Sequence, residues 1–333
     1  MHEQIEHCPF CKSSCFSIIQ TYYTKISEKH FLYKCENCNS SFSDTYGSFL
    51  HRLRTPVALI ILVLNSLSEG MGINASARIF KISKNTIYSW LNKFTELRKV
   101  LFLHSLCVNY VKMVVEGDEL YTKVNSNVPQ EDSLGWTIVF IERRTRFIWL
   151  MQCGKKDKKL FKDAIRILYE VIKQTQDFKL FTDGERRYSK MLFEICFDLI
   201  YTGRRPRKTL KKGIQVRIKN KGSRNHKPGP KPSKYVQPKQ EHPETINDIE
   251  NSDIHANHTE AFNASLRRKC AAYRRRTNTY AKVKEKLQQR LDLHWIKHNF
   301  IDAHYTTKKV PAIDIGIIDN PFSWEQIFNL RVG

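Results

Sequence analysis

The spacing of apolar residues divides this chain of 333 residues into parts with different periods. From Thr55 to Leu67 nearly every position is apolar. This predicts a buried helix started by Thr55-Pro56, because proline is tolerated in a first helical turn. Between residues 110 and 202, apolar runs of strand length alternate with segments of helical period. From Asn257 to Gln289 the helical period returns, and we expect one long helix there. The pattern predicts helices first and a mixed α/β unit after them.

The mixed region has a definite order of predicted elements. In chain order these are a strand at Val111–Asp118, a hairpin of Trp136–Ile141 and Phe147–Cys153, a helix after Asp157, a strand at Phe178–Thr182, a helix at about 185–197 and a strand at Leu199–Thr202. With the helix after residue 257, this is the element order of the ribonuclease H-like fold. We therefore expect a multidomain α/β protein with a mixed sheet of that class.

Two short helical patterns precede the mixed region. Asn74–Phe80 and Lys84–Phe94 are separated by a tight turn, and Ser83 is a suitable N-cap, so a helix-turn-helix is expected. The second helix would bury Ile87, Leu91 and Phe94 on one face. Its exposed front, where such a motif contacts DNA bases, would then carry Lys84, Asn85, Thr86 and Tyr88. An ordinary three-helix bundle is the alternative interpretation.

Four cysteines near the start of the chain have the spacing of a metal site. Cys8 and Cys11 form one CxxC pair, Cys35 and Cys38 form a second, and 23 residues separate the two pairs. Two such pairs can place four thiolates around one Zn²⁺ ion, and the short apolar segments between them favour a zinc ribbon. Four thiolates leave no open coordination position, so this zinc would be structural. Cys15 has no partner at a suitable spacing.

The charge of the chain favours a polyanionic partner. It has 56 Lys and Arg against 33 Asp and Glu, a formal net charge of +23, so nucleic acid is the first partner to consider. The imbalance is largest from Gly203 to Gln240, which contains 14 basic residues, five prolines and no acid. We expect this stretch to be an extended or disordered basic arm, within an insertion at 203–252. Its basic segments are candidates for a DNA minor groove, with a solvated loop as the alternative.

Composition also suggests a compartment. The longest apolar run, Val57–Leu64, is eight residues, far below the roughly 20 that a spanning helix requires. The first residues lack the basic start and apolar run of a secretory signal. We expect a cytoplasmic, nucleoid-associated protein of a prokaryote, with reduced cysteines.

Two aspartates occupy the ends of predicted strands. Strand alternation places Glu116 and Asp118 on one face of the first strand and turns Glu119 to the other. Asp183 follows the strand Phe178–Thr182, at the carboxyl end where functional residues of α/β sheets gather. Both are candidates for a catalytic carboxylate pair.

A third carboxylate is expected beyond the basic arm. Asp248, Glu250, Asp253 and Glu260 are available, and the helical pattern favours Glu260. On a single helix Glu260 would head a face that continues through Arg267, Arg274 and Asn278, so the helix would carry a metal ligand and then follow DNA phosphates. His255 and His258 are interpreted as solvated or phosphate-contacting residues. Three convergent carboxylates suit a pair of Mg²⁺ ions, with Mn²⁺ as an alternative.

These residues resemble the DDE transposases of bacterial insertion sequences, most closely the insertion sequence one family. The similar motifs are Cys8-Pro-Phe-Cys11 with Cys35-Glu-Asn-Cys38, Gly117-Asp-Glu-Leu-Tyr121, Phe181-Thr-Asp-Gly184 and Thr259-Glu-Ala-Phe-Asn263. The resemblance implies that Asp118, Asp183 and Glu260 form the catalytic triad and bind Mg²⁺. It also implies that Asn263 and Arg267 sit beside the active site, and we expect DNA contacts from Asn263, Arg267, Arg268, Arg274, Arg275 and Arg276.

The resemblance implies a transposase that binds the terminal repeats of its element, cleaves a DNA strand and joins the new 3′ hydroxyl to target DNA. Two ends must be held together, so a homodimer or a higher oligomer is expected. The alternatives are a DNA-binding regulator descended from such an enzyme and a structure-directed nuclease without strand transfer. The expected domains are a zinc ribbon at 1–50, a helix-turn-helix at 51–104, a catalytic domain at 105–300 and a tail at 301–333.

Overall fold

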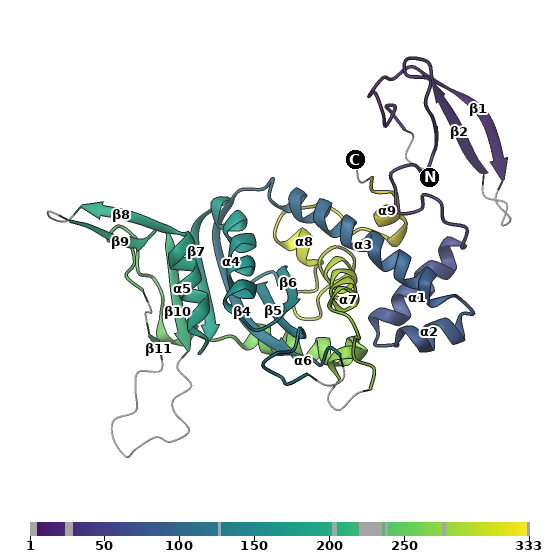
Figure 1. The fold of residues 1–333 in the computed structure, drawn as a ribbon. Helices are drawn as coiled ribbons and strands as arrows, with labels where there is room; N and C mark the ends of the chain where they lie inside the picture. Colours follow the sequence, from purple (N-terminus) through teal and green to yellow (C-terminus); the bar gives the residue numbers. More distant parts are fainter. Residues whose placement is uncertain are drawn as a thin grey trace.

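The computed structural model describes most of the chain. The described residues are 5–23, 29–125, 128–201, 205–219, 235–236, 239–274 and 278–331. They form a small three-stranded sheet, a group of helices and a mixed sheet with helices on both faces (Figure 1). None of the helices in these ranges is long and apolar enough to cross a membrane.

The mixed sheet has six strands in the order β11-β10-β7-β4-β5-β6. Their bounds are β4 Tyr110–Tyr121, β5 Trp136–Glu142, β6 Ile148–Gly154, β7 Thr175–Asp183, β10 Ile214–Lys219 and β11 Tyr235–Val236. The central strands β4, β7 and β10 are parallel, whereas β5 and β6 continue the sheet antiparallel. The predicted first strand, hairpin and fourth strand are confirmed, and the fold is mixed α/β.

Helices cover the two faces of this sheet. On one side lie α4 (Lys158–Lys173) and α5 (Arg186–Ile195), whose Tyr188 packs edge-on against Phe140 of β5. Asp157 caps α4 by accepting from the backbone N–H of Leu160, as predicted. The other side is covered by α6 (Asn257–Lys269) and by α7 (Lys284–Ile296), which packs between β6 and the N-terminal helices.

The N-terminal helices are α1 (Val57–Ser68), α2 (Ile73–Ile79) and α3 (Lys84–Ser105). Ser83 is the N-cap of α3 and accepts from the backbone N–H of Asn85, as expected. The helix continues 11 residues beyond the predicted end at Phe94, because Leu97 and Leu101 prolong its buried stripe against the rest of the core. Sequence and structure therefore agree on a short helix, a tight turn and a second helix.

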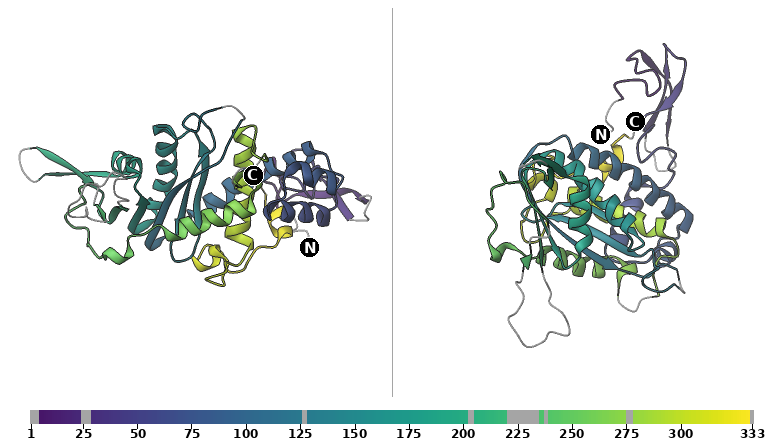
Figure 2. Two further views of the ribbon diagram at one scale, coloured as in Figure 1. Left: turned by 90° about the horizontal axis from the view of Figure 1, so that it is seen from below. Right: turned by 60° about the vertical axis from the view of Figure 1, so that its left-hand side comes forward.

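The first residues form a separate small sheet. It consists of β1 (Phe16–Tyr23), β2 (Lys29–Cys35) and β3 (Ser41–Ser43), all antiparallel, around a core that contains Phe42. In Figures 1 and 2 this sheet stands apart from the mixed sheet, with the N-terminal helices between them. The short apolar segments between the CxxC pairs thus form strands β1 and β2.

The last part of the chain returns to the N-terminal helices. After a π-helical turn at Lys297–Ile301, the chain forms α8 (Pro311–Asp314) and α9 (Trp324–Asn329), and Ser323 and Gln326 form a capping box at α9. The ring of Phe328 stacks on Phe49 with centroids 4.5 Å apart. The Trp324 indole N–H donates to the side chain of Asn65 on α1. Figure 1 shows α9 beside α1 and α3.

The single helix expected from Asn257 to Gln289 is wrong. Cys270 has an extended backbone, a 3₁₀ turn (η2) follows at Ala271–Tyr273, and α7 begins only at Lys284. The break is fixed by packing, because buried Tyr273 shares a hydrogen bond with Thr137 of β5. Arg274 and Asn278 therefore do not continue a helical face from Glu260.

The expectation of a structureless arm is also wrong for its first part. Residues 197–201 and 206–210 form the hairpin β8–β9 (Phe197–Tyr201, Pro206–Leu210), which projects from the mixed sheet (Figure 1). The predicted fifth strand thus stays outside that sheet, and β10 takes its place beside β7. Ile214, Val216 and Ile218 alternate and are buried, and this strand pattern is stronger than the local basic charge. The Pro-rich run at 227–234 lies outside the described residues.

Candidate functional site

Asp118 and Asp183 lie side by side on the central strands. Strands β4 and β7 are parallel, and Gly117 pairs with Thr182, so the residue after each occupies the same level of the sheet. Paired residues of parallel strands project to the same face, so both carboxylates point away from α4 and α5. Gly184, with a φ of +62°, then turns the chain towards α5. The two predicted aspartates are brought together by strand register alone.

Helix α6 lies against this pair. The side-chain amide of Asn263 donates a hydrogen bond of 2.9 Å to a carboxylate oxygen of Asp118. Glu260 lies one turn earlier on the same side of α6, and it is exposed. Within the described ranges, Asp118, Asp183 and Glu260 are not among the groups whose ligand atoms all lie within 4.8 Å of one another. The structure thus joins α6 to Asp118 through Asn263, and it does not bring Glu260 into a three-residue cluster with the two aspartates.

Glu116, two positions before Asp118, fixes the start of α6. Its carboxylate is fully buried and accepts from Arg143 Nε at 2.8 Å, from His258 Nδ1 at 2.7 Å and from the backbone N–H groups of His258 and Thr259. These N–H groups belong to the first turn of α6, where a helix has no internal acceptors. Glu116 therefore fastens the helix that carries Glu260 to strand β4.

The charge of Glu116 is stabilised by these partners. Burial acts to raise the pKa of Glu116, but the hydrogen bond from His258 and the charge of Arg143 outweigh it and lower the pKa. Sequence reasoning placed Glu116 on this face without giving it a role. It interpreted His258 as solvated or phosphate-contacting, whereas Nδ1 of His258 is hydrogen-bonded to the buried Glu116 carboxylate. The two-residue spacing of the acids placed Glu116 on the same strand face as Asp118, but its partners are distant in the sequence and gave no local signal of its role.

Glu116, His255 and His258 also have ligand atoms close enough to hold a metal ion. Both oxygens of Glu116 already accept hydrogen bonds, however, and Arg143 supplies a full positive charge at 2.8 Å. A cation would have to displace that guanidinium. We therefore interpret this cluster as a helix anchor.

The rival acids have other partners. Asp248 accepts from Lys112 at 3.0 Å and from buried Lys179, and the hydrogen bond from Lys179 lowers the pKa of Asp248 to about 2. Glu250 and Asp253 form a capping box around a 3₁₀ turn (η1, Asn251–Asp253). Glu119 points to the opposite face and pairs with Lys156 at 2.9 Å, as strand alternation predicts.

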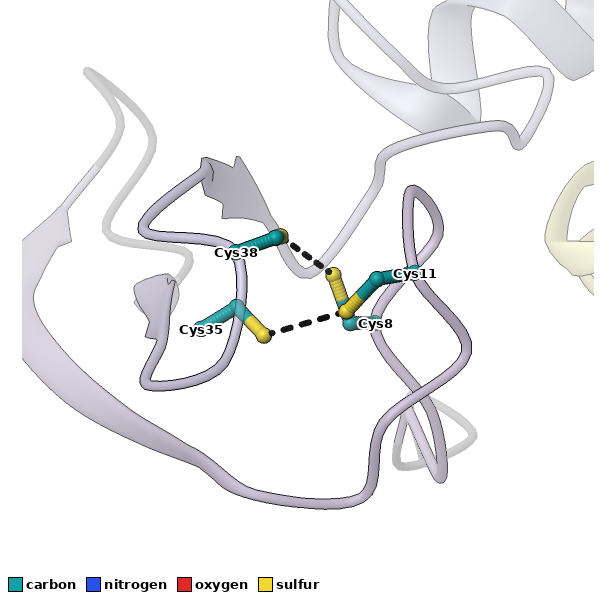
Figure 3. Close-up of side chains that lie close together, drawn as sticks. All are labelled: Cys8, Cys11, Cys35 and Cys38. Carbon is teal, nitrogen blue, oxygen red and sulfur yellow. Dashed lines mark hydrogen bonds between the residues drawn. The ribbon is translucent and has the colours of Figure 1, made fainter.

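Four thiols of the first sheet converge on one point (Figure 3). The sulfur atoms of Cys8 and Cys38 are 3.7 Å apart, and those of Cys11 and Cys35 are 3.5 Å apart. Thiolates bound tetrahedrally at 2.3 Å from one Zn²⁺ would be about 3.8 Å apart, so the spacing fits that ion. Hydrogen bonds from Ser40 lower the pKa of Cys38 to about 6, which favours the thiolate form of this one thiol, whereas the pKa of Cys11 is raised to about 11. The four cysteines could therefore hold a zinc ion.

The predicted DNA-contacting residues have different surroundings. Lys84 and Asn85 are exposed at the start of α3, whereas Thr86 and Tyr88 are half-buried. On α6, Arg267 is half-buried and Arg268 is exposed, but Arg274 donates to the carbonyl of Gly70. The remaining two, Arg275 and Arg276, lie outside the described residues.

Comparison with known proteins gives little further information. No family model matches this sequence, and no curated protein matches it. A crystal structure of the Mos1 strand transfer complex matches 41% of this chain with 10% identity and a TM-score of 0.16. This chain spans about half, 53%, of the solved chain that it matches. A TM-score this low establishes neither a shared fold nor a shared activity.

Proposed function

We propose that this protein is a transposase that cleaves and joins DNA strands with Asp118, Asp183 and Glu260. The observation that carries the proposal is the registered pair of aspartates on β4 and β7, with α6 hydrogen-bonded to Asp118. The order of strands, hairpin and helices around this pair supports a ribonuclease H-like fold. No His or Ser nucleophile is needed, because water and then a DNA 3′ hydroxyl are the attacking groups.

Carboxylate oxygens are the donors that Mg²⁺ prefers, so the chemistry of this set fits the ion. When bound, Mg²⁺ would activate the attacking oxygen and stabilise the leaving oxygen. Asp118 and Asp183 would hold it, with Glu260 as the third ligand. Asn263 orients the Asp118 carboxylate, and Glu116 fixes the helix from which Glu260 projects.

DNA binding is proposed for the parts outside the sheet. The zinc ribbon and the helix-turn-helix would bind the terminal repeats of the element, with the front of α3 towards the bases. Phosphate contacts would come from Arg267 and Arg268 on α6 and from the exposed basic residues of the β8–β9 hairpin. The expected domain boundaries at 50, 104 and 300, and a homodimer or higher oligomer, are part of this proposal. The proposal also includes the expected location of the protein in a prokaryotic cytoplasm.

A joining assay tests the proposal. The substrate is a labelled, pre-cut end taken from DNA flanking the gene, with plasmid as target and Mg²⁺ present. We expect the wild type to join and Glu260→Gln to lose joining while still binding the end. Glu250→Gln is the matched control, because Glu250 is an exposed acid that caps a neighbouring turn.

Three other outcomes have defined meanings. If wild type and Glu260→Gln both join, the third ligand is assigned wrongly. If neither joins although both bind the end, a DNA-binding regulator derived from such an enzyme is favoured. If the wild type cuts DNA without terminal repeats and never joins a pre-cut end, the protein is a structure-directed nuclease.

A further inference from the structure

The side of α6 that faces away from Asp118 borders a cavity of about 700 Å³. Its walls come from α6, from the end of α7 with the following π-helical turn, and from residues 302–306. Neither Asp118, Asp183 nor Glu260 lines it. The lining includes four basic residues and two histidines that a ligand could contact: Arg146, Arg268, Lys269, Lys297, His294 and His298.

The lining is strongly cationic. Arg146, Arg268, Lys269 and Lys297 contribute four positive charges, and Asp302 is the one carboxylate among the lining residues that the structure describes. That carboxylate accepts from Lys297 at 2.6 Å, so among the lining residues the positive charges outnumber the negative charge by three. Arg268 and Lys269 are exposed, and a ligand can reach both from solvent. The net positive charge of the lining therefore favours an anionic ligand.

Two buried polar atoms in the walls have no partner among the described residues. His294 is only 7% exposed, and its Nε2 makes no hydrogen bond there; Nη1 of Arg146 is likewise buried and unpaired. Buried polar groups in folded proteins are normally hydrogen-bonded, because leaving them unpaired is costly. A ligand with several acceptor oxygens would satisfy the Arg146 guanidinium, and it would also satisfy His294 when Nε2 carries a proton.

We propose that this cavity binds a phosphate group of a DNA strand. Phosphate oxygens match guanidinium and ammonium donors in geometry and charge, which explains two arginines and two lysines around one cavity. The ring of Phe262 on α6 packs edge-on against His298 and gives the same cavity an apolar wall for a sugar or base. Only the choice of DNA as the phosphate source rests on the proposed function.

The histidines of the cavity provide a direct readout. Burial lowers the pKa of His298 to about 4 and that of His294 well below its usual range, so both are neutral at pH 7. A bound phosphate group would favour their protonated forms and raise both pKa values. Their ring resonances should therefore move when the ligand binds, whereas filling by a neutral additive would leave the pKa values low.

The experiment titrates the full-length protein with inorganic phosphate at constant ionic strength, with chloride as the reference anion, and follows the histidine ring resonances by NMR. Mg²⁺ is left out so that no cleavage is required. We expect phosphate to move the His294 and His298 resonances. The double variant Arg268→Gln/Lys269→Gln should weaken this binding at least about tenfold. Lys158→Gln/Lys159→Gln, which removes two exposed charges from α4, should leave it unchanged.

A second titration with a short DNA duplex identifies the source of the phosphate. DNA should move the same resonances, and Arg268→Gln/Lys269→Gln should weaken DNA binding more than the α4 variant does. If phosphate moves the resonances and DNA does not, the DNA assignment is overturned and the cavity serves a free phosphate compound. If chloride acts as well as phosphate, or if no resonance moves, the cavity is not a phosphate site. Joining activity is not measured, so these outcomes are independent of the catalytic proposal.

Discussion

Asn263 on α6 donates a hydrogen bond of 2.9 Å to Asp118 on β4, although the two residues are 145 positions apart in the sequence. This hydrogen bond holds α6 against the carboxyl ends of the central strands β4 and β7, where Asp183 also lies. It links the placement of the proposed third ligand to the orientation of the first.

Replacing Asn263 with alanine should reduce joining by about 10- to 100-fold, because an unsupported carboxylate ligand loses its orientation. Binding of the element end should be nearly unchanged. Joining rates and DNA affinity would be measured in parallel. Asn278→Ala, at an exposed asparagine beyond α6, is the control. Equal rates for wild type and Asn263→Ala would show that Asp118 needs no support from α6.

Changing Glu116 to glutamine should destabilise the protein by about 3 kcal/mol, because buried Glu116 is the charged partner of Arg143 and His258. Joining should be lost as well, because α6 is released. Urea unfolding would give the free energy. Glu119 lies on the same strand and forms an ion pair with Lys156. We expect Glu119→Gln to lower the free energy of unfolding by less than Glu116→Gln does. A larger effect at Glu119 would contradict the anchoring role of Glu116.

Asp248 should make the stability depend on pH in acid. Its folded pKa is lowered from 3.8 to about 2, so its ion pair stabilises the fold above about pH 4 and is lost as the pH falls towards 2. The Asp248 side chain is 39% exposed, so we expect the ion pair to contribute only about 1 kcal/mol to the free energy of unfolding. Unfolding of wild type and Asp248→Asn would be compared from pH 7 to pH 2. The difference should shrink as the pH falls, and a constant difference would exclude the ion pair as its cause.

The cysteine cluster should bind one zinc ion per chain. Cys35→Ser should abolish stoichiometric binding, because Cys35 is fully buried within the four-thiol group. Elemental analysis of the purified protein would measure the content, and a chelator should unfold the β1–β3 sheet in the wild type. Cys15→Ser, at an exposed thiol outside the group, should keep its zinc. Full zinc content in Cys35→Ser would refute the site.

Sequence reasoning succeeded where geometry is local. Strand alternation alone predicted that Glu116 and Asp118 share one face and that Glu119 points to the other. The contacts of all three residues confirm this prediction. The caps at Ser83 and Asp157 were predictable for the same reason, because a cap depends on a few consecutive residues. The spacing of the two CxxC pairs likewise determined which thiols meet.

Prediction from the sequence failed where contacts between residues far apart in the chain override the local pattern. The helical period runs through Cys270, but buried Tyr273 and its bond to Thr137 end the helix there. The dense positive charge after residue 203 concealed β10, whose Arg217 is buried against Glu241. The alternation of Ile214, Val216 and Ile218 was a local strand signal, but the partner of Arg217 lies 24 positions further along and could not be read from a local window. The role of Glu116 was missed because its partners lie on α6 and on the β5–β6 turn.

The packing of α9 has a consequence for the order in which the protein can assemble during synthesis. Phe328 completes the aromatic core around Phe49, and Arg331 donates to the carbonyls of Asp44 and Tyr46 beside the cysteine sheet. A ribosome produces residues 44–49 long before it produces residues 324–331. The N-terminal unit therefore leaves the ribosome with part of its core exposed, and that core is completed only after the mixed sheet has been translated. Nascent chains that stop short of Trp324 would lack that closure and would be open to proteases.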